Sequence, residues 1–229
     1  NNSWGSNRKF YKAYEGATGY DGGNNLDIKD LDAAYKSYYP FVVNGKNFLD
    51  AAYEVATRYG VIQIFTAGNR DGMKESYTRA MLPYFRPDAE KYLLNVTGQL
   101  EGDTQRYNTP GHSKWWSVAA PAKPIYSTVV DLKTGKADYG TKGGTSMAAP
   151  HVTGALGVIM QRYPYMNNAQ IREVLLTTAR QIHDDFKEPA DTRKISGFSA
   201  ALGVPDERWG WGVVDLYKAM FGPGQLLGV

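Results

Sequence analysis

The chain has no cysteine, which excludes disulfide bonds, thiol catalysis and zinc sites built on cysteine. The excess of one sign of charge over the other is also small: the formal net charge is +3, too low to indicate binding to nucleic acid or to an anionic membrane. Charged or polar residues interrupt every apolar run before it reaches the length of a membrane span. The composition therefore predicts neither a nucleic-acid partner nor membrane contact from this segment.

Metal-binding patterns are weak as well. Asp27, Asp30 and Asp32 are the only acidic group with a hint of metal-loop spacing, but they lack the glycine and the closing glutamate of a calcium loop. A solvated acidic face is the favoured interpretation of this group. We therefore assign no metal ligand from the sequence.

The 229 residues suit one large α/β domain, or part of one. Residues 1–5 have no initiator methionine and no signal-type apolar core, and they have the pattern of a strand that runs into a glycine turn. We expect the chain to have been cut inside a domain. Two polar segments, near 6–46 and 182–207, are predicted to be surface insertions.

Apolar spacing predicts helices that alternate with short buried strands. A helix is predicted over 48–59, and strands are predicted near 61–65, 92–97 and 116–120. A hairpin is predicted with its turn at 133–136. Strands that alternate with helices indicate a parallel sheet with helices on its faces, and ligands gather at the carboxyl ends of the strands in such sheets.

Three helices are predicted in the last third of the chain. The first presents Val152, Ala155, Leu156 and Ile159 on one face, and the second presents Ile171, Val174 and Leu175, with Asn167 or Asn168 as its cap. The last helix is predicted from about 213 to 220.

The segment Gly143–His151 carries the strongest chemical signal. Ser146 stands among small residues, which let a substrate backbone come close, and an apolar helix begins directly behind it. A helix start presents unpaired N–H groups and a positive partial charge to an anion. Two other serine patterns fit less well. The esterase elbow requires glycine where Ala148 stands, and the pattern of penicillin-recognising enzymes requires lysine where Ala149 stands. The structural alternative is a tight turn before a core helix.

Acyl transfer also needs hydrogen-bond donors for the oxyanion. Asn69, directly after a predicted strand, is the best candidate for a side-chain donor, and its amide would join the backbone N–H of Ser146. The alternative is an ordinary turn asparagine whose side chain accepts a backbone hydrogen bond.

None of the three histidines is a convincing base. His151 follows Ser146 by five residues, which places it about 140° away around a helix, so a structural role is favoured. His112 stands in an apparent loop, and His183 follows a helix beside two aspartates.

These segments resemble the subtilases, the subtilisin-like serine proteases. Gly143–His151 matches their nucleophile segment residue for residue, Thr66–Asn69 resembles their oxyanion segment, and Trp209–Asp215 resembles their closing segment. Within the family, the chain is most similar to the catalytic passenger domains of Gram-negative autotransporters, particularly over 82–87, 107–108, 114–116 and 151–156. A disulfide that some of these relatives form is impossible here because the chain lacks cysteine.

The resemblance implies a three-layer α/β fold with a mostly parallel sheet and helices on both faces, incomplete at the N-terminus. Residues 1–229 would be the C-terminal portion of one peptidase domain that cleaves protein or peptide substrates through an acyl-enzyme. The subtilase triad runs aspartate, histidine, serine along the chain. We therefore expect the first two in an N-terminal remainder before Asn1, and we expect this chain alone to be inactive.

The resemblance also implies a substrate groove, a cell location and a cofactor. Ser3, Trp4 and Gly5 would form one wall of the groove and Thr66, Ala67 and Gly68 the other, with Thr145 beside the nucleophile. Trp4 could instead be packed under the sheet. Export from a Gram-negative bacterium to the cell surface or beyond is implied, and so is calcium binding, for which no ligand is assigned.

One functional alternative comes from a different class. A catalytically inactive subtilase-like domain could serve as a surface binding or adhesion module, with the tyrosine-rich segment 11–39 making the contacts, since tyrosine is enriched at interfaces.

Overall fold

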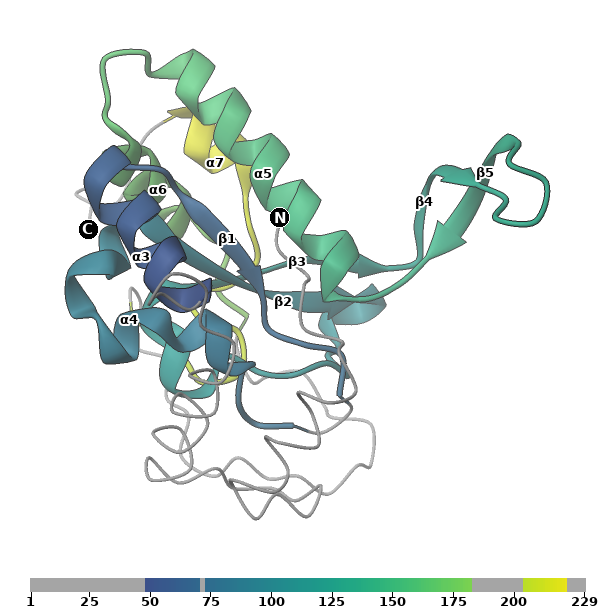
Figure 1. Cartoon of the computed structure of the whole chain (residues 1–229), viewed down its shortest axis with the longest axis horizontal. Helices are drawn as coiled ribbons and strands as arrows, with labels where there is room; N and C mark the ends of the chain where they lie inside the picture. Colours follow the sequence, from purple (N-terminus) through teal and green to yellow (C-terminus); the bar gives the residue numbers. More distant parts are fainter. Residues whose placement is uncertain (1–47, 71–72, 183–203, 222–229) are drawn as a thin grey trace.

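A computed structural model describes residues 48–70, 73–182 and 204–221, which form a body with one projecting hairpin (Figure 1). The expected groove residues Ser3, Trp4 and Gly5, the aspartate group at 27–32 and His183 lie outside the described residues. So do the predicted insertion at 6–46 and most of the one at 182–207. No helix in the described ranges combines the length and the apolar character that crossing a bilayer requires.

Three parallel strands form the central sheet, in the order β1 (Gln63–Thr66), β2 (Leu93–Leu100) and β3 (Ser117–Lys123). Their cores are almost continuously buried, as expected for strands covered on both faces. Val213 adds a parallel bridge to Ala119 on the free side of β3. The predicted parallel sheet is confirmed.

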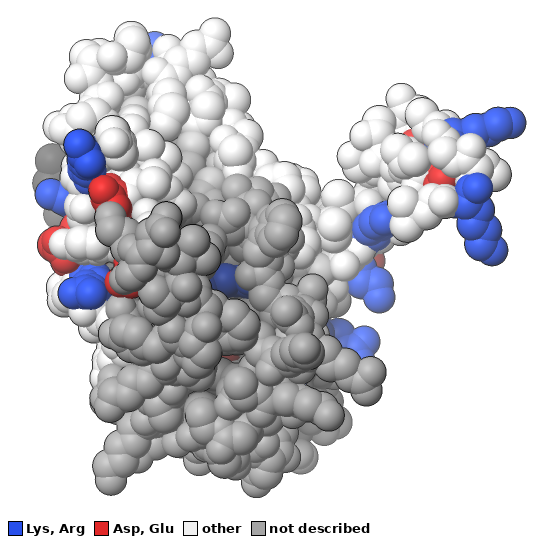
Figure 2. All heavy atoms as spheres, viewed as in Figure 1, with Lys and Arg blue, Asp and Glu red and all other residues white. Residues whose placement is uncertain are grey.

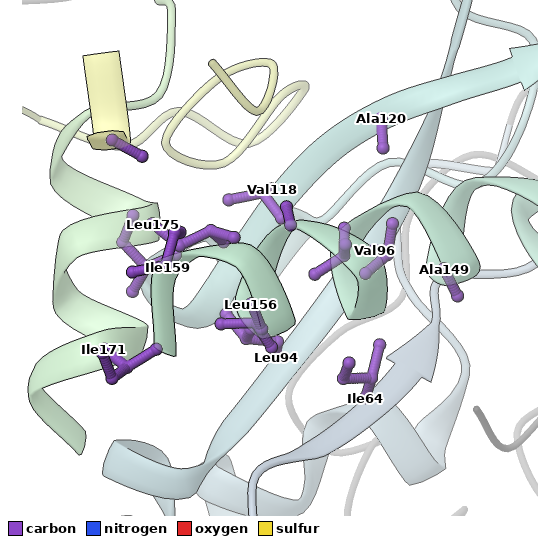
Figure 3. Packing of buried hydrophobic residues seen from close by; sticks show 14 of the residues in the cluster. Ile64, Leu94, Val96, Val118, Ala120, Ala149, Leu156, Ile159, Ile171 and Leu175 are labelled. Atoms are coloured by element: carbon purple, nitrogen blue, oxygen red, sulfur yellow. The ribbon is translucent and has the colours of Figure 1, made fainter. Parts of the chain in front are cut away.

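Helices cover both faces of this sheet, because neighbouring residues along each strand point to opposite sides. Ile64 and Leu94 face α5 (Thr145–Arg162), α6 (Asn168–Thr177) and α7 (Leu216–Phe221), and Figure 3 shows this packing. Phe65 and Leu93 face the other way, toward α3 (Phe48–Tyr59) and α4 (Leu82–Phe85). The three-layer α/β architecture predicted from the sequence is therefore confirmed.

Short 3₁₀ segments complete the second face and the loops. They are η2 (Thr78–Met81), η3 (Pro87–Tyr92), η4 (Glu101–Asp103) and η5 (Gly111–Trp116). Trp116 packs in the second-face cluster and donates its indole N–H to the Ala80 carbonyl, at 2.7 Å. Residues between β1 and β2 are thereby fastened under the sheet.

The apolar faces predicted for the two long helices are buried as expected. Asn167, not Asn168, caps α6: its side chain accepts the Gln170 N–H at 3.0 Å, and the Gln170 side chain accepts the Asn167 N–H at 2.9 Å. The Asn168 side chain instead donates to the Gly60 carbonyl, at 2.8 Å.

The last helix begins later than the sequence predicts. The prediction of a start near 213 was wrong, because Val213 forms isolated backbone bridges with both Ala119 and Arg180. Helix α7 begins at Leu216, and the Asp215 carboxylate accepts the Lys218 N–H at 3.0 Å.

The predicted hairpin is present as β4 (Ile125–Val130) and β5 (Ala137–Lys142), paired antiparallel. Its turn is closed by Asp131, whose carboxylate accepts the Lys133 N–H and the Thr134 hydroxyl, both at 2.8 Å. Figure 2 shows the hairpin standing clear of the body, with basic side chains at its surface. Its base lies directly before α5.

Candidate active site

Ser146 occupies the first turn of α5, at the carboxyl end of the sheet. Gly144 is the N-cap, with φ 139°, and it donates its N–H to the Ala122 carbonyl of β3 at 3.0 Å. Thr145 is buried, whereas Ser146 is partly exposed. Because the first N–H groups of a helix have no carbonyl acceptor within the helix, the Ser146 N–H is available to a ligand. The helix start also carries a positive partial charge.

Pro150 affects the same turn. It lies four residues after Ser146 within α5 and has no N–H, so it cannot donate to the Ser146 carbonyl as a helical residue would. Within the first turn, the Met147 and Ala148 N–H groups donate to the Gly144 carbonyl, and the turn is also held from outside by the bond from Gly144 to β3 and by the bonds that Thr145 makes. The nucleophile segment thus takes its position from the sheet and from the loop beside it.

Asn69 approaches this turn from the end of β1, at the same edge of the sheet. Its side-chain oxygen Oδ1 accepts two hydrogen bonds from Thr145, one from the backbone N–H and one from the hydroxyl, both at 2.8 Å. The amide nitrogen Nδ2 lies against Gly144, where an added Cβ would stand 3.1 Å from it. Residues 76 positions apart in the chain therefore meet beside Ser146.

The Asn69 side chain does accept a backbone hydrogen bond, but the donor is not part of its own turn. Acceptance from Thr145 uses the oxygen end of the amide and leaves the two Nδ2 hydrogens for another acceptor. Asn69 itself is exposed, whereas Gly68 before it is buried. The side-chain amide thus sits at the surface with its donor end unused by Thr145.

The wall expected at 66–68 is tightly held. Thr66 and Ala67 are buried, and the Ala67 N–H donates to the Val96 carbonyl at 2.9 Å. The Ala67 carbonyl accepts the Tyr77 N–H at 2.8 Å. Both backbone polar groups of Ala67 are thus occupied within the fold, and Gly68 is the last buried residue before the exposed Asn69.

A cleft of about 380 Å³ opens directly beside Ser146. Met147, Pro150 and His151 of α5 form one side, and residues of β4 and β5 form the other. Sequence reasoning predicted the hairpin but did not link it to the site. The signal was available, because β5 ends only three residues before Thr145.

The two described histidines have other partners than Ser146. His151 directs Nδ1 to the Met147 carbonyl at 2.8 Å, one turn back in α5, so this nitrogen carries the proton. In the described part of the chain no hydrogen bond joins a histidine to Ser146. The His151 side chain is exposed at the cleft and is not packed in the core, so its predicted structural role stays a prediction.

His112 is paired with Glu75, a buried carboxyl under the second face of the sheet. The Glu75 oxygens accept the His112 backbone N–H at 2.9 Å and lie 2.6 Å from its Nδ1. Burial raises the pKa of Glu75, although the His112 bonds oppose this shift. The hydrogen bond to Glu75 raises the pKa of His112, against partial desolvation. The Glu75–His112 pair links two loops. Among the described residues, neither member of the pair forms a hydrogen bond with Ser146.

Across residues 48–70, 73–182 and 204–221, no three histidine, aspartate or glutamate side chains gather as a metal ion would require. The structure therefore adds no candidate ligand for the calcium that the resemblance implies.

A second group of residues was missed by sequence reasoning. The Asn95 side chain lies fully buried on β2, with Nδ2 at 2.7, 2.8 and 2.9 Å from the hydroxyls of Ser76, Ser113 and Ser117. Each of these hydroxyls donates to a backbone carbonyl, which leaves its lone pairs facing Asn95. This polar cluster and the neighbouring Asn108 fasten the segment that follows Asn69.

Comparison with known proteins places this geometry in a family. A model described as the subtilase family matches residues 1–212. Among curated proteins, the chain is 34% identical over 187 residues to an extracellular serine protease of Serratia marcescens, covering 73% of this chain and 16% of that protein. It is 33% identical over 202 residues to serotype-specific antigen 1 of Mannheimia haemolytica, covering 86% and 20%.

The match to the autotransporter lipoprotein NalP of Neisseria meningitidis is 32% over 176 residues, covering 70% of this chain and 14% of NalP. The predicted similarity to autotransporter subtilases is thereby confirmed. The chain spans a fifth or less of the length of these three relatives.

Among solved structures, the prenylagaramide maturation protease PagA superposes with a TM-score of 0.55 at 17% identity, covering 86% of this chain and 68% of PagA. The patellamide maturation protease PatA gives 0.52 at 17% identity, covering 90% and 58%. These likenesses concern the fold alone, and the family model supplies the assignment. This chain belongs to the subtilase family.

Proposed function

We propose that this chain is the part of a serine endopeptidase domain that carries the nucleophile and the oxyanion donors. The whole protein would hydrolyse peptide bonds through an acyl-enzyme on Ser146. The observation that supports this most directly is the pair of hydrogen bonds from Thr145 to Asn69 Oδ1, which brings the Asn69 amide beside the first turn of α5.

The proposed chemistry follows from the groups at this edge of the sheet. The Ser146 hydroxyl oxygen attacks the substrate carbonyl carbon, and the carbonyl π electrons move onto oxygen. The resulting oxyanion accepts hydrogen bonds from the Ser146 N–H and from Asn69 Nδ2, which are fixed before the reaction begins. Thr145 contributes indirectly. Its two hydrogen bonds fix the Oδ1 end of the Asn69 amide, so the Nδ2 end points away from Thr145.

The base would be a histidine, oriented by an aspartate, in sequence that precedes Asn1. It would take the Ser146 proton and pass it to the leaving amine as the peptide C–N bond breaks. Water would then release the acyl group by the same route in reverse. This chain alone would lack that base, and the N-terminal remainder of the domain would therefore be its obligatory partner.

The substrates proposed are proteins or peptides in extended form. Residues 66–68 and 145, together with 3–5, would line the groove that holds the substrate. Because the backbone groups of Ala67 and the N–H of Thr145 are bonded within the fold, strand-like pairing with the substrate backbone would fall to residues 3–5. The cleft of about 380 Å³ beyond Ser146 would receive the part of the substrate that leaves with the amine. We also propose that the protein acts at the surface of a Gram-negative bacterium or outside it, which is supported by two relatives named an extracellular protease and an autotransporter.

The test uses the full-length protein. A fluorophosphonate should label the intact protein at Ser146, and Ser146→Ala should abolish both labelling and casein hydrolysis. Thr153→Ala is the matched control, because it removes another hydroxyl of α5 whose hydrogen bond runs only to the Ala149 carbonyl. It should leave both readouts unchanged. Folded protein that binds host or bacterial partners but shows no Ser146-dependent hydrolysis would favour the inactive binding module instead.

The oxyanion assignment has its own test. Asn69→Ala should lower kcat while KM changes little, because the donor acts mainly in the transition state. Removal of the corresponding side-chain donor in a subtilisin is the measured example of this effect, with a loss of about 100- to 1000-fold in kcat, and that size is taken over from it. An unchanged kcat would remove Asn69 from the mechanism.

A further inference from the structure

The loop that carries Asn69 has no helix or strand to orient its peptide groups. Asn69 lies three residues beyond the end of β1, and its own backbone N–H reaches only the Tyr77 hydroxyl, at 3.4 Å. A donor on such a loop needs an anchor if its amide is to stay within hydrogen-bond distance of an oxyanion. The contacts of this loop identify the anchor.

Asn108 holds the chain on both sides of Asn69. Its backbone N–H donates to the Gly68 carbonyl at 3.3 Å, and its side-chain Oδ1 accepts the Arg70 N–H at 2.8 Å. Its Nδ2 donates to the Glu75 carbonyl at 2.8 Å, farther along the same loop. One residue thus fixes the peptide groups immediately before and after Asn69.

Asn108 is itself tied to the sheet. It is fully buried, and its carbonyl accepts the Thr97 hydroxyl of β2 at 2.7 Å. The connection therefore runs from the central strand through Asn108 to the two residues that flank Asn69. Because β2 is the middle strand, the anchor rests on a rigid part of the fold.

The close approach of loop and anchor requires glycine at position 68. Gly68 has φ 127°, and an added Cβ would stand 2.7 Å from Asn108 Oδ1 and 2.6 Å from the Tyr77 ring. Only glycine, which has no Cβ, fits between these side chains. The loop is therefore packed directly on the Asn108 amide rather than merely near it.

An asparagine suits this position for a chemical reason. Its amide supplies one acceptor for the Arg70 N–H and one donor for the Glu75 carbonyl, and an aspartate would supply acceptors only. Alanine would supply neither, and a buried polar group deprived of its partner destabilises the arrangement that holds it. The loop would then relax toward other partners.

We infer that Asn108 is a positioning residue for Asn69: it holds the Asn69 loop so that Oδ1 meets Thr145 and Nδ2 meets the oxyanion. The inference rests on the role proposed for Asn69. A misplacement of about 1 Å in a catalytic group can lower the rate about 100-fold. Asn108→Ala should therefore lower kcat about 10- to 100-fold and leave KM within about twofold.

The test is a double-mutant cycle in the full-length protein, with a fluorogenic peptide chosen from its casein cleavage sites. If Asn108 acts through Asn69, Asn108→Ala lowers kcat in the protein that retains Asn69. In the protein that already carries Asn69→Ala, it changes kcat by less than about threefold. An equal loss in both backgrounds, or no loss in either, overturns the inference. If Asn69→Ala alone leaves kcat unchanged, it is the oxyanion role of Asn69 that fails.

Two further variants keep the test decisive. Asn167→Ala removes the α6 cap at a distance from the site and controls for general destabilisation, so its kcat should be unchanged. Thr97→Val removes the hydroxyl bond to Asn108, together with the bond that this hydroxyl accepts from Gln105 Nε2, with little change of shape, and it serves if Asn108→Ala does not fold. It should lower kcat less than Asn108→Ala, again only when Asn69 is present, and equal effects in both backgrounds would overturn the inference.

Discussion

The two donors proposed for the oxyanion are held in different ways. Ser146 stands on α5, whose inner face packs apolar side chains such as Ala149, Leu156 and Ile159 into the first-face core (Figure 3). Asn69 stands on a loop that is held by hydrogen bonds, chiefly from Asn108. A backbone N–H in a helix is oriented by the helix, so non-directional packing suffices to place it. A side chain on a loop needs directional bonds.

The same contrast applies to a cluster of buried polar groups on the second face of the sheet. Asn95, Ser76, Ser113 and Ser117 lie under the loops of the second face, and Glu75 and His112 pair beside them. Buried polar groups cost free energy unless they are paired, and paired networks specify one arrangement. On the second face, polar side chains therefore occupy positions that apolar side chains could fill, and their hydrogen bonds fix the conformation of the loops.

The strongest test of the apolar side is Ile159→Ala. Ile159 is fully buried between α5 and the sheet, so its truncation should lower the free energy of unfolding by about 2 to 5 kcal/mol. Urea unfolding of the full-length protein measures this loss. Val158→Ala, on the exposed side of the same helix, should cost about 0.5 kcal/mol or less. Similar losses for the two variants would contradict the apolar anchoring of α5.

The corresponding test of the polar side is Asn95→Ala. It removes an amide whose two Nδ2 hydrogens serve a group of three buried hydroxyls, which should lower the free energy of unfolding by about 1 to 3 kcal/mol. Asn95→Asp should be at least as destabilising, because it buries a carboxylate among oxygens that already donate elsewhere. Both are measured by urea unfolding, and an Asp variant as stable as the native protein would refute the hydrogen-bond directions described here.

The smallest expected effect concerns pH. His112 has a folded pKa above its ordinary 6.5, so its pairing with Glu75 stabilises the fold fully below pH 6.5 and less as pH rises through the folded pKa. Glu75 also has a raised pKa, and its contribution declines in the same direction above 4.5. Lys114 and Glu207 are the other charged groups that act on this pair. The effect should be about 1 kcal/mol or less, since the imidazole is partly exposed and screened.

His112→Asn removes the titrating ring and keeps an N–H donor near the Glu75 carboxylate. Comparison of the urea midpoints of the two proteins from pH 5 to 9 isolates the contribution of His112. The native protein should lose its advantage over the variant as the pH rises. A difference that is constant or grows with pH would show that the ring does not carry the proton that this pairing requires.

Much of the fold could be predicted from local patterns. The near-continuous apolar runs placed β1, β2 and β3 to within a few residues, and the spacing of Val152, Ala155, Leu156 and Ile159 marked the inner face of α5. Asn167 and Asn168 could not be told apart as caps, because either has the right chemistry. The last helix was predicted too early, since nothing local shows that Val213 is held beside Ala119.

The sequence alone determined the family, the alternation of strands and helices, and the placement of Ser146 before an apolar helix, because each depends on residues close together in the chain. Only the tertiary structure decided that Asn69 Oδ1 meets Thr145, that the hairpin forms a wall of the cleft beside Ser146, and that Asn108 fastens the Asn69 loop to β2. Hydrogen bonds of this kind form between groups 11 to 76 residues apart and demand distances near 3 Å. Such distances follow from how the layers pack, which no local pattern encodes.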